Sequence, residues 1–174
     1  MLITGGCRSG KSGYALACGR AKSPRIFIAT ATACDDEMAG RIKMHRTERG
    51  ERWKTVEEPL ALAEALNENS AHNGIVVVDC ITLWTNNMIH GGKTDGAITR
   101  RVSELGKAVL QAESSVIIVT NEIGAGIVPE NPLARRFRDL LGLANQRLAS
   151  VCGRVVCMIA GIPLPIKEEK DDES

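Results

Sequence analysis

The first residues of the chain have the types and the spacing of a phosphate-binding loop. The segment reads G-G-C-R-S-G-K-S and fits the pattern G-x-x-x-x-G-K-S/T. In such a loop, backbone N–H groups and the positive end of the following helix hold the phosphates of a nucleotide. Lys11 would reach the β- and γ-phosphates, and the Ser12 hydroxyl would bind Mg²⁺. The residues expected to contact a nucleoside triphosphate are Gly5, Gly6, Cys7, Arg8, Ser9, Gly10, Lys11 and Ser12.

A carboxylate at the end of an apolar run is the second candidate. Asp79 directly follows Ile75–Val78, which has the character of a buried strand. In phosphate-loop proteins such a carboxylate holds Mg²⁺ directly or through water. We therefore expect Asp79 to complete the metal site with Ser12, although an ordinary turn aspartate would give the same pattern.

Two further polar segments follow expected strands. Thr30, Ala31 and Thr32 come after one apolar run, and 120–122 (T-N-E) come after another. Ligands of open parallel sheets bind beyond the carboxyl ends of the strands, so both segments are expected to face one crevice. Their hydroxyls could contact phosphate or ribose, and Glu122 could bind a substrate hydroxyl or act as a base. Helix caps and turns use the same residue types, which leaves both interpretations open.

One histidine has a setting suited to nucleophilic chemistry. A helix is expected over 36–49, and within it Arg41, His45 and Arg49 are spaced four apart. Residues with this spacing share a helix face. Flanking guanidinium groups would favour the neutral, nucleophilic imidazole and could hold a phosphate beside it. The spacing alone does not distinguish this site from a solvated basic face.

These candidates need a scaffold that brings them to one edge of a sheet. Short apolar runs predict strands over 1–4, 25–29, 75–78, 116–119 and 155–159. Helices are expected over 12–20, 36–49, 59–67, 95–113 and 132–151. Continuous apolar runs indicate strands that are buried on both faces, as in a parallel sheet. The alternation of strands and helices predicts an α/β fold of the phosphate-loop NTPase type, with a mostly parallel sheet flanked by helices.

Composition narrows the classes of function. A length of 174 residues suits a single domain, expected over 1–167, followed by an acidic and disordered tail over 168–174. A net charge of +1 and an aromatic content of 3% disfavour nucleic acid as a partner. No run of about 20 apolar residues and no signal peptide is recognisable, so we expect a cytoplasmic protein without a membrane span. The six cysteines include no C-x-x-C pair, which disfavours a zinc site.

Longer motifs occur in order along nearly the whole chain. They are T-G-G-C-R-S-G-K-S at 4–12, I-A-T-A at 28–31, D-D-E-M-x-x-R-I-x-x-H at 35–45, W-K-T-V-E-E at 53–58, D-C-I-T-L-W at 79–84 and a long motif beginning T-N-E-I-G-A-G-I-V-P-E-N at 120–149. The series resembles the bifunctional adenosylcobinamide kinase/adenosylcobinamide-phosphate guanylyltransferase family of cobalamin biosynthesis. Such a series is far more specific than a phosphate loop alone.

The resemblance implies two reactions on a corrinoid substrate. The γ-phosphoryl group of ATP or GTP passes to the aminopropanol hydroxyl of adenosylcobinamide. GMP from GTP is then transferred to the new phosphate, which releases pyrophosphate and gives adenosyl-GDP-cobinamide. The family's guanylylated histidine corresponds to His45, which joins Lys11 as a catalytic residue. The resemblance also implies a homotrimer, and a phosphate-loop fold related to the recombinase-type core.

The family's nucleotide contacts extend beyond the loop. They correspond to Thr30, Ala31, Thr32, Arg46, Thr47, Glu48, Arg49, Glu57 and Asp79. Glu57 is nominated by the resemblance alone. Met44 precedes the nucleophile where some relatives carry another histidine, which leaves His45 as the sole candidate.

Two other classes of function remain open at this point. One is a single-activity small-molecule kinase that uses the same loop while His45 is inert. The other is a non-enzymatic nucleotide switch or a recombinase-like DNA-binding module. A guanine switch should show N-K-x-D after a strand, but Asn121 is followed by Glu122. The sequence does not choose between ATP and GTP for phosphoryl transfer, nor does it locate the corrinoid.

Overall fold

A single seven-stranded sheet forms the centre of the molecule. The computed structural model describes residues 1–32, 40, 44, 46–47 and 49–168. Its strands are β1 (Leu2–Gly5), β2 (Arg25–Ala29), β3 (Lys54–Glu57), β4 (Ile75–Asp79), β5 (Ser115–Val119), β6 (Val155–Ile159) and β7 (Ile162–Lys167). They lie in the order β3-β2-β4-β5-β1-β6-β7, and all neighbours are parallel except β6 and β7.

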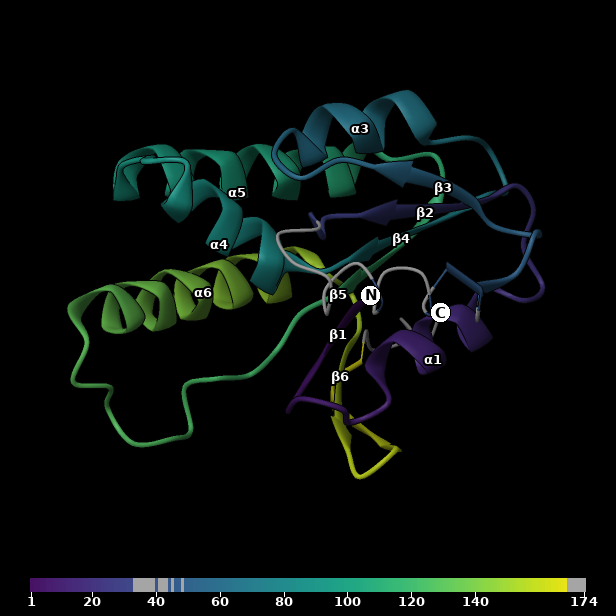
Figure 1. Ribbon diagram of the computed structural model, residues 1–174. Coiled ribbons are helices and arrows are strands. Elements are labelled where there is room, and N and C mark those ends of the chain that lie inside the picture. The colour runs from purple at the N-terminus through teal and green to yellow at the C-terminus, as the bar shows by residue number, and fades with distance from the viewer. Residues whose placement is uncertain (33–39, 41–43, 45, 48, 169–174) are drawn as a thin grey trace, which may run out of the picture.

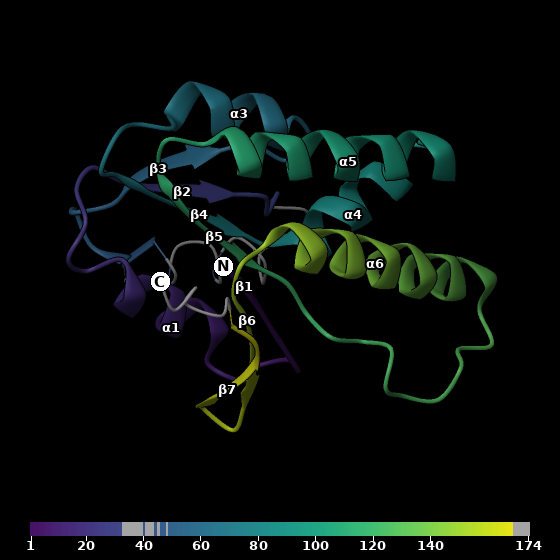
Figure 2. The ribbon, with the colours of Figure 1, turned by 180° about the vertical axis from the view of Figure 1, so that it is seen from behind.

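Helices cover both faces of this sheet. They are α1 (Lys11–Cys18), α3 (Leu62–Asn69), α4 (Ile81–His90), α5 (Asp95–Gln111) and α6 (Pro132–Val151). Figures 1 and 2 show α3, α4, α5 and α6 on one side of the sheet and α1 on the other. The expected fold class is confirmed: the chain is an α/β protein with a mostly parallel sheet flanked by helices. Within the part of the chain that is described, no helix combines the length and the apolar character needed to cross a membrane.

The central strands bury side chains on both faces. On β4, Val76 and Val78 pack against the four-helix side, whereas Val77 packs on the side of Ala15 in α1. All three valines are fully buried. Burial on two faces removes the need for polar alternation, which explains why these strands read as continuous apolar runs.

Two edge strands and one helix were not expected from the sequence. β3 is short and polar, and among the described residues it pairs only with β2. β7 contains Pro163 and Pro165, which argue against a central strand but are tolerated at a sheet edge. α4 is rich in β-branched residues and asparagine, which favour helix weakly. Its burial of Ile81, Trp84 and Met88 supplies the stability that propensity does not.

Several helix boundaries differ from the expected ones for local reasons. α3 begins at Leu62 rather than at residue 59, because Glu58 Oε1 accepts the N–H groups of Leu60 and Ala61 in a preceding turn. α1 ends at Cys18 rather than at residue 20, because the Arg20 N–H donates to the Ala17 carbonyl oxygen in a tighter turn. α6 spans the expected residues, and the Asn131 side chain caps its first turn.

Two expectations fall largely on residues that are not described. Of the helix expected over 36–49, the described residues at 40, 44, 46, 47 and 49 are helical. The acidic tail lies outside the described residues from 169 onward, so its disorder stays a prediction, as does the division into a domain over 1–167 and a tail.

Candidate active site

The predicted phosphate-binding loop joins a strand to a helix. β1 ends at Gly5 and α1 begins at Lys11. Gly5 has a φ of 139°, and a Cβ atom there would lie 2.4 Å from the carbonyl oxygen of Met158 on the neighbouring strand. Gly10 has a φ of 92° and caps α1. Only glycine adopts both conformations readily, so the two outer glycines of the pattern are required by the backbone.

Lys11 is a buried cation at the start of α1. Its side chain is 8% exposed, and Nζ donates to the Gly6 carbonyl oxygen at 2.6 Å. Burial lowers the pKa of the Lys11 ammonium, and the nearby Asp79 carboxylate partly opposes this shift. A desolvated ammonium beside backbone N–H groups favours an incoming phosphate, because phosphate would restore the lost solvation.

Ser12 and Asp79 meet across the sheet edge. The Ser12 hydroxyl donates to Asp79 Oδ2 at 2.7 Å. Both groups offer the hard oxygen ligands that Mg²⁺ prefers, and Mg²⁺ usually needs only one or two carboxylates in addition to substrate phosphates and water. The pair therefore fits such an ion. Among the described residues there is no cluster of three or more His, Cys, Asp or Glu side chains that could hold a metal alone.

Thr30 fixes the end of β4 from beneath the site. Its hydroxyl accepts the Cys80 N–H and donates to the Cys80 carbonyl oxygen, both at 2.8 Å, and its own N–H donates to the Asp79 carbonyl oxygen. The side chain is fully buried. Its hydroxyl thus serves the backbone beside Asp79. Of the two residues that follow, Ala31 lines the cavity described next and Thr32 is exposed.

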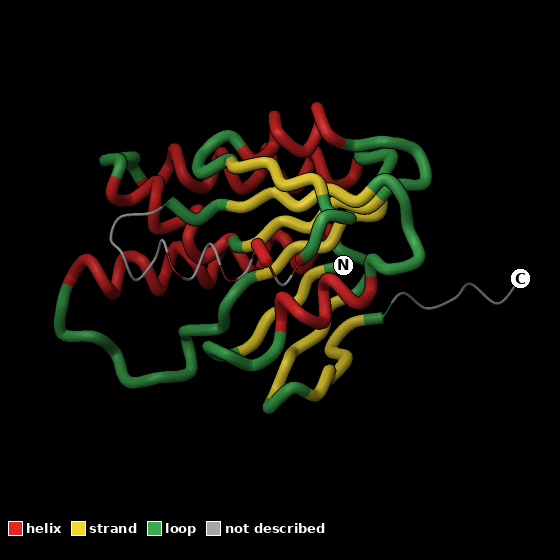
Figure 3. The backbone as a smooth tube through the Cα atoms, turned by 45° about the vertical axis from the view of Figure 1, so that its right-hand side comes forward, coloured by secondary structure: helices red, strands yellow, loops and turns green. Residues whose placement is uncertain are grey.

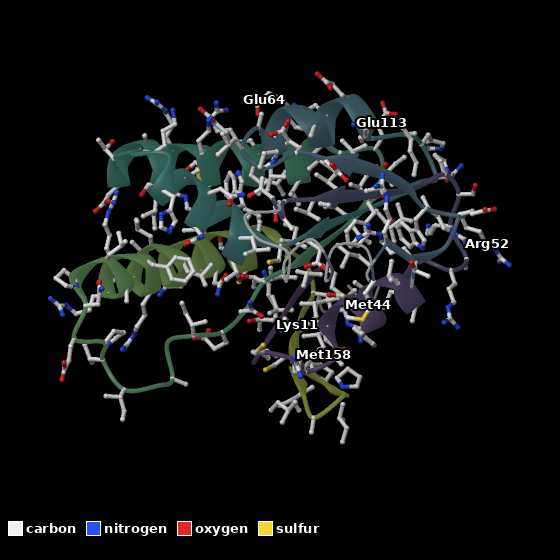
Figure 4. All side chains as sticks on the ribbon, viewed as in Figure 1. Lys11, Met44, Arg52, Glu64, Glu113 and Met158 are labelled. Carbon is white, nitrogen blue, oxygen red and sulfur yellow. The ribbon has the colours of Figure 1, made fainter. Side chains whose placement is uncertain are left out.

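A cavity of about 1480 Å³ lies over the phosphate loop and the ends of β2 and β4. Lys11 and Met44, both labelled in Figure 4, line this cavity. Among the residues proposed from the sequence, the lining includes Cys7, Arg8, Ser9, Gly10, Lys11, Ser12, Ala31, Arg49, Glu57 and Asp79. The candidates from five separate segments are thereby brought together.

Apolar side chains that the sequence did not mark as ligand contacts also line this cavity. They include Leu16, Phe27, Trp53 and Leu83. The Trp53 ring meets Phe27 edge-on, with the ring centroids 6.4 Å apart. Such contacts join distant segments, and only an analysis of strand order would have indicated them.

Arg49 lies half-buried against this aromatic wall. Its guanidinium carbon is 4.0 Å from the centroid of the Phe27 ring, a cation–π contact. Burial lowers the pKa of Arg49, whereas the Asp79 and Glu57 carboxylates act in the opposite direction. Its Nε atom is buried and has no hydrogen-bond partner among the described residues. An unsatisfied cationic donor that lines this cavity suits an anionic ligand.

The remaining candidates divide into exposed residues and residues outside the description. Arg46 Nη1 lies 3.7 Å from Glu57 Oε1, and both side chains are more than half exposed. Thr47 is exposed as well. His45 and Glu48 lie outside the described residues, as does Arg41, so the basic helix face stays a prediction.

The segment after β5 contributes one side chain to the cavity. Asn121 is among the lining residues. The Thr120 hydroxyl instead donates to Asn145 Oδ1 at 2.7 Å, on the side of α6. Glu122 Oε1 accepts the Gly124 N–H at 2.6 Å, which folds this exposed carboxylate onto its own loop. This geometry favours Glu122 as a brace of the loop over the role of a base.

The sequence matches one family along almost its whole length. The model of the family described as "CobU: Cobinamide kinase / cobinamide phosphate guanyltransferase" matches residues 1–166. The bifunctional adenosylcobalamin biosynthesis protein CobU of Escherichia coli (strain K12) is 40% identical over 179 residues, covering 96% of this chain and 99% of that protein. CobP of Pseudomonas aeruginosa, described in the same words, is 40% identical over 172 residues, with 97% of each chain covered.

Solved structures of distant sequence share the architecture. A protein of Pyrococcus horikoshii OT3 has a TM-score of 0.58 at 10% identity, covering 98% of this chain and 87% of that one. The RadB recombinase has a TM-score of 0.50 at 17% identity, covering 90% of this chain and 73% of that one. Likeness at such identities shows the fold alone, and it confirms the expected recombinase-like core.

Proposed function

Because this chain belongs to the cobinamide kinase / cobinamide phosphate guanyltransferase family, we propose that it carries out both reactions on adenosylcobinamide. It would phosphorylate the aminopropanol hydroxyl with ATP or GTP, and then transfer GMP from GTP to the resulting phosphate. The observation that carries the proposal is the buried Lys11 beside the Ser12–Asp79 pair, within a chain that matches the family over 1–166.

The phosphate loop supports phosphoryl transfer by charge and position. Lys11, at the base of the cavity, would bind the β- and γ-phosphates and draw developing negative charge away from the transferred group. Its bond to the Gly6 carbonyl would be exchanged for bonds to phosphate oxygens. Arg49 brings a second cation to the same cavity. Two cations and a set of backbone N–H groups favour the binding of a negatively charged triphosphate.

A magnesium ion fits the proposal through the donors described above. Ser12 and Asp79 would hold it, and when bound it would neutralise charge on the phosphates. Thr30 keeps the Asp79 backbone in place through its bonds around Cys80.

Guanylyl transfer would proceed through His45. A neutral imidazole attacks the α-phosphorus of GTP, pyrophosphate leaves, and a phosphoramidate to the histidine forms. The phosphate of adenosylcobinamide phosphate then attacks this adduct and restores the imidazole. Splitting one displacement into two gives each step a better nucleophile or leaving group. The support for this route is the match of D-D-E-M-x-x-R-I-x-x-H to the family pattern.

An assay with both substrates tests the proposal. Purified protein is incubated with adenosylcobinamide, GTP and Mg²⁺. The corrinoid products are then separated and identified by mass spectrometry. We expect adenosylcobinamide phosphate first and adenosyl-GDP-cobinamide later. Accumulation of the phosphate alone would favour the single-activity kinase, and absence of both products would contradict the proposal. Retention on DNA at low salt would instead favour the recombinase-like alternative, which the net charge of +1 disfavours.

We also propose that the protein works as a homotrimer in the cytoplasm. Support for self-association comes from apolar side chains that no part of the described chain covers. Ile127 is 96% exposed on the long loop between β5 and α6, which Figure 3 shows extending away from the sheet. Ile162, Leu164 and Ile166 on β7 are all more than half exposed. Burial of such groups between subunits would be favourable.

Light scattering coupled to gel filtration checks the oligomeric state. We expect the wild-type protein to have the mass of three subunits. Ile127→Asp or Leu164→Asp should shift it toward monomer, because each places a charge within an apolar contact. Leu110→Asp, at an exposed apolar position of α5, is the matched control for the added charge. A monomeric wild-type protein would contradict the proposal.

A further inference from the structure

Asn121 is a polar residue of the cavity to which neither the phosphate loop nor the family resemblance gives a role. We propose that its side-chain amide donates a hydrogen bond to the phosphoryl group that is transferred in the kinase reaction. This inference rests on the proposed function. Three observations support it: the place of β5 between β4 and β1, the face of the sheet on which Asn121 lies, and the hydrogen bonds that fix the Asn121 backbone.

Strand order puts Asn121 between the two halves of the phosphate site. β5 lies between β4, which ends at Asp79, and β1, which ends at Gly5. Backbone pairing with β1 continues past the end of β5, because Thr120 donates to Ile3 and Glu122 donates to the Gly5 carbonyl oxygen at 3.1 Å. Asn121 is therefore held beside the first residue of the phosphate loop.

The alternation of side chains puts Asn121 on the face that carries the loop and α1. Val119 packs into the core on the α1 side, and residues two apart in an extended chain share a face. Thr120 points to the opposite side, where it meets Asn145 of α6. On β4, Val77 and hence Asp79 share the α1 face as well. Asn121 and Asp79 thus approach the cavity from the same side of the sheet.

Hydrogen bonds on both sides fix the Asn121 backbone. Its N–H donates to Thr82 Oγ1 at 2.9 Å, and Thr82 is 8% exposed at the start of α4. Its carbonyl oxygen accepts from Asn145 Nδ2 at 3.1 Å. Within the described part of the chain, the Asn121 side chain makes no hydrogen bond. The side chains of Thr82 and Asn145 therefore hold the Asn121 backbone in place, and the Asn121 amide can bind a ligand.

An amide is chemically suited to the terminal phosphate. Its Nδ2 donates to a phosphoryl oxygen without adding charge, so it can follow the group as negative charge shifts toward the leaving oxygen. The β-phosphate belongs in the loop, whereas the γ-phosphate lies toward the Ser12–Asp79 pair. Asn121 lies between the strands that carry these two sites. The geometry thus assigns it to the γ-phosphoryl group rather than to the base or ribose.

Two substitutions test this assignment, and the first of them is isosteric. In Asn121→Asp a carboxylate replaces the donor and repels phosphate, and in Asn121→Ser the amide is lost without added charge. We expect Asn121→Asp to lower the kcat of adenosylcobinamide phosphorylation about 100-fold, the usual effect of removing one donor to developing charge. The loss in guanylyl transfer, measured with adenosylcobinamide phosphate supplied directly, should be at least about tenfold smaller. Asn121→Ser should show the same pattern with a smaller loss.

The matched control makes the same chemical change outside the cavity. Asn131→Asp also converts an amide to a carboxylate, and aspartate can keep the cap on Leu133 and Ala134. We expect it to behave as wild type. The inference is overturned if both Asn121 variants fold and phosphorylate at the wild-type rate, or if both reactions fall equally. If the wild-type protein makes no adenosylcobinamide phosphate, the proposed function fails first and the inference falls with it.

Discussion

Replacing His45 with alanine is expected to abolish guanylyl transfer while adenosylcobinamide is still phosphorylated. The imidazole would form the covalent bond to GMP, and a neighbouring group cannot take over that bond without being placed at the α-phosphorus. We expect the second reaction to fall at least about 1,000-fold, the scale on which loss of a nucleophile acts. Incubation with GTP labelled at the α-phosphate should leave an acid-labile label on the wild-type protein and none on His45→Ala.

His72→Ala is the control for loss of a histidine as such. His72 is exposed in the turn between α3 and β4, away from the lining residues of the cavity. This variant should carry the label at the wild-type level. A label that persists in His45→Ala would place the nucleophile elsewhere. Loss of both reactions in His45→Ala would indicate a role in binding or folding instead of a covalent one.

Lys11→Met should remove both activities, which separates it from the histidine variant. Lys11 is the buried cation of the phosphate loop, and each reaction binds a triphosphate there under the proposed function. We expect kcat/KM to fall about 1,000-fold for phosphoryl transfer, because the charge acts on the transferred group as well as on binding. Steady-state assays of each reaction check this. Lys54→Met on the exposed edge strand β3 is the control and should keep full activity.

The same substitution should not weaken the fold. Burial lowers the pKa of Lys11, so the charged form is less favourable in the folded protein than in the unfolded chain. Methionine removes that cost, and we expect the Tm at neutral pH to stay equal or rise. In the wild-type protein the cost shrinks as pH rises from the lowered pKa toward the usual 10.5, where the unfolded chain holds more protons. A clear fall in Tm of Lys11→Met would contradict this account and make its lost activity uninformative.

The central strands could be predicted because a strand that is buried on both faces has an uninterrupted run of apolar residues. Ile75–Val78 is apolar without interruption, since helices cover both sides of β4. α4 could not be predicted in this way. Its stability comes from the burial of Trp84 and its neighbours against other elements, whereas its own residues favour helix weakly. The edge strands β3 and β7 were not predicted for a related reason. Solvent on their outer side means that they need no continuous apolar run.

The site shows the same division between local and distant information. The loop pattern and Asp79 are recognisable because short spacings encode them, although their binding roles stay predictions. The positioning role of Thr30 could not be predicted, since its hydroxyl binds the backbone of Cys80, 50 residues away. The stacking of Arg49 on Phe27 likewise depends on how two segments meet in space.

The two prolines of β7 bear on how molecules of this protein can associate. Proline has no N–H group, and Pro163 and Pro165 lie opposite Met158 and Val156. They are two residues apart, so their backbone nitrogens point to the same side of the strand. Their nitrogens therefore face outward, and the outer edge of the strand lacks the regular row of donors that an added strand requires. Sheets of neighbouring molecules cannot readily join there into a continuous ribbon, which protects an apolar edge from aggregation. Any association through β7 must use its side chains.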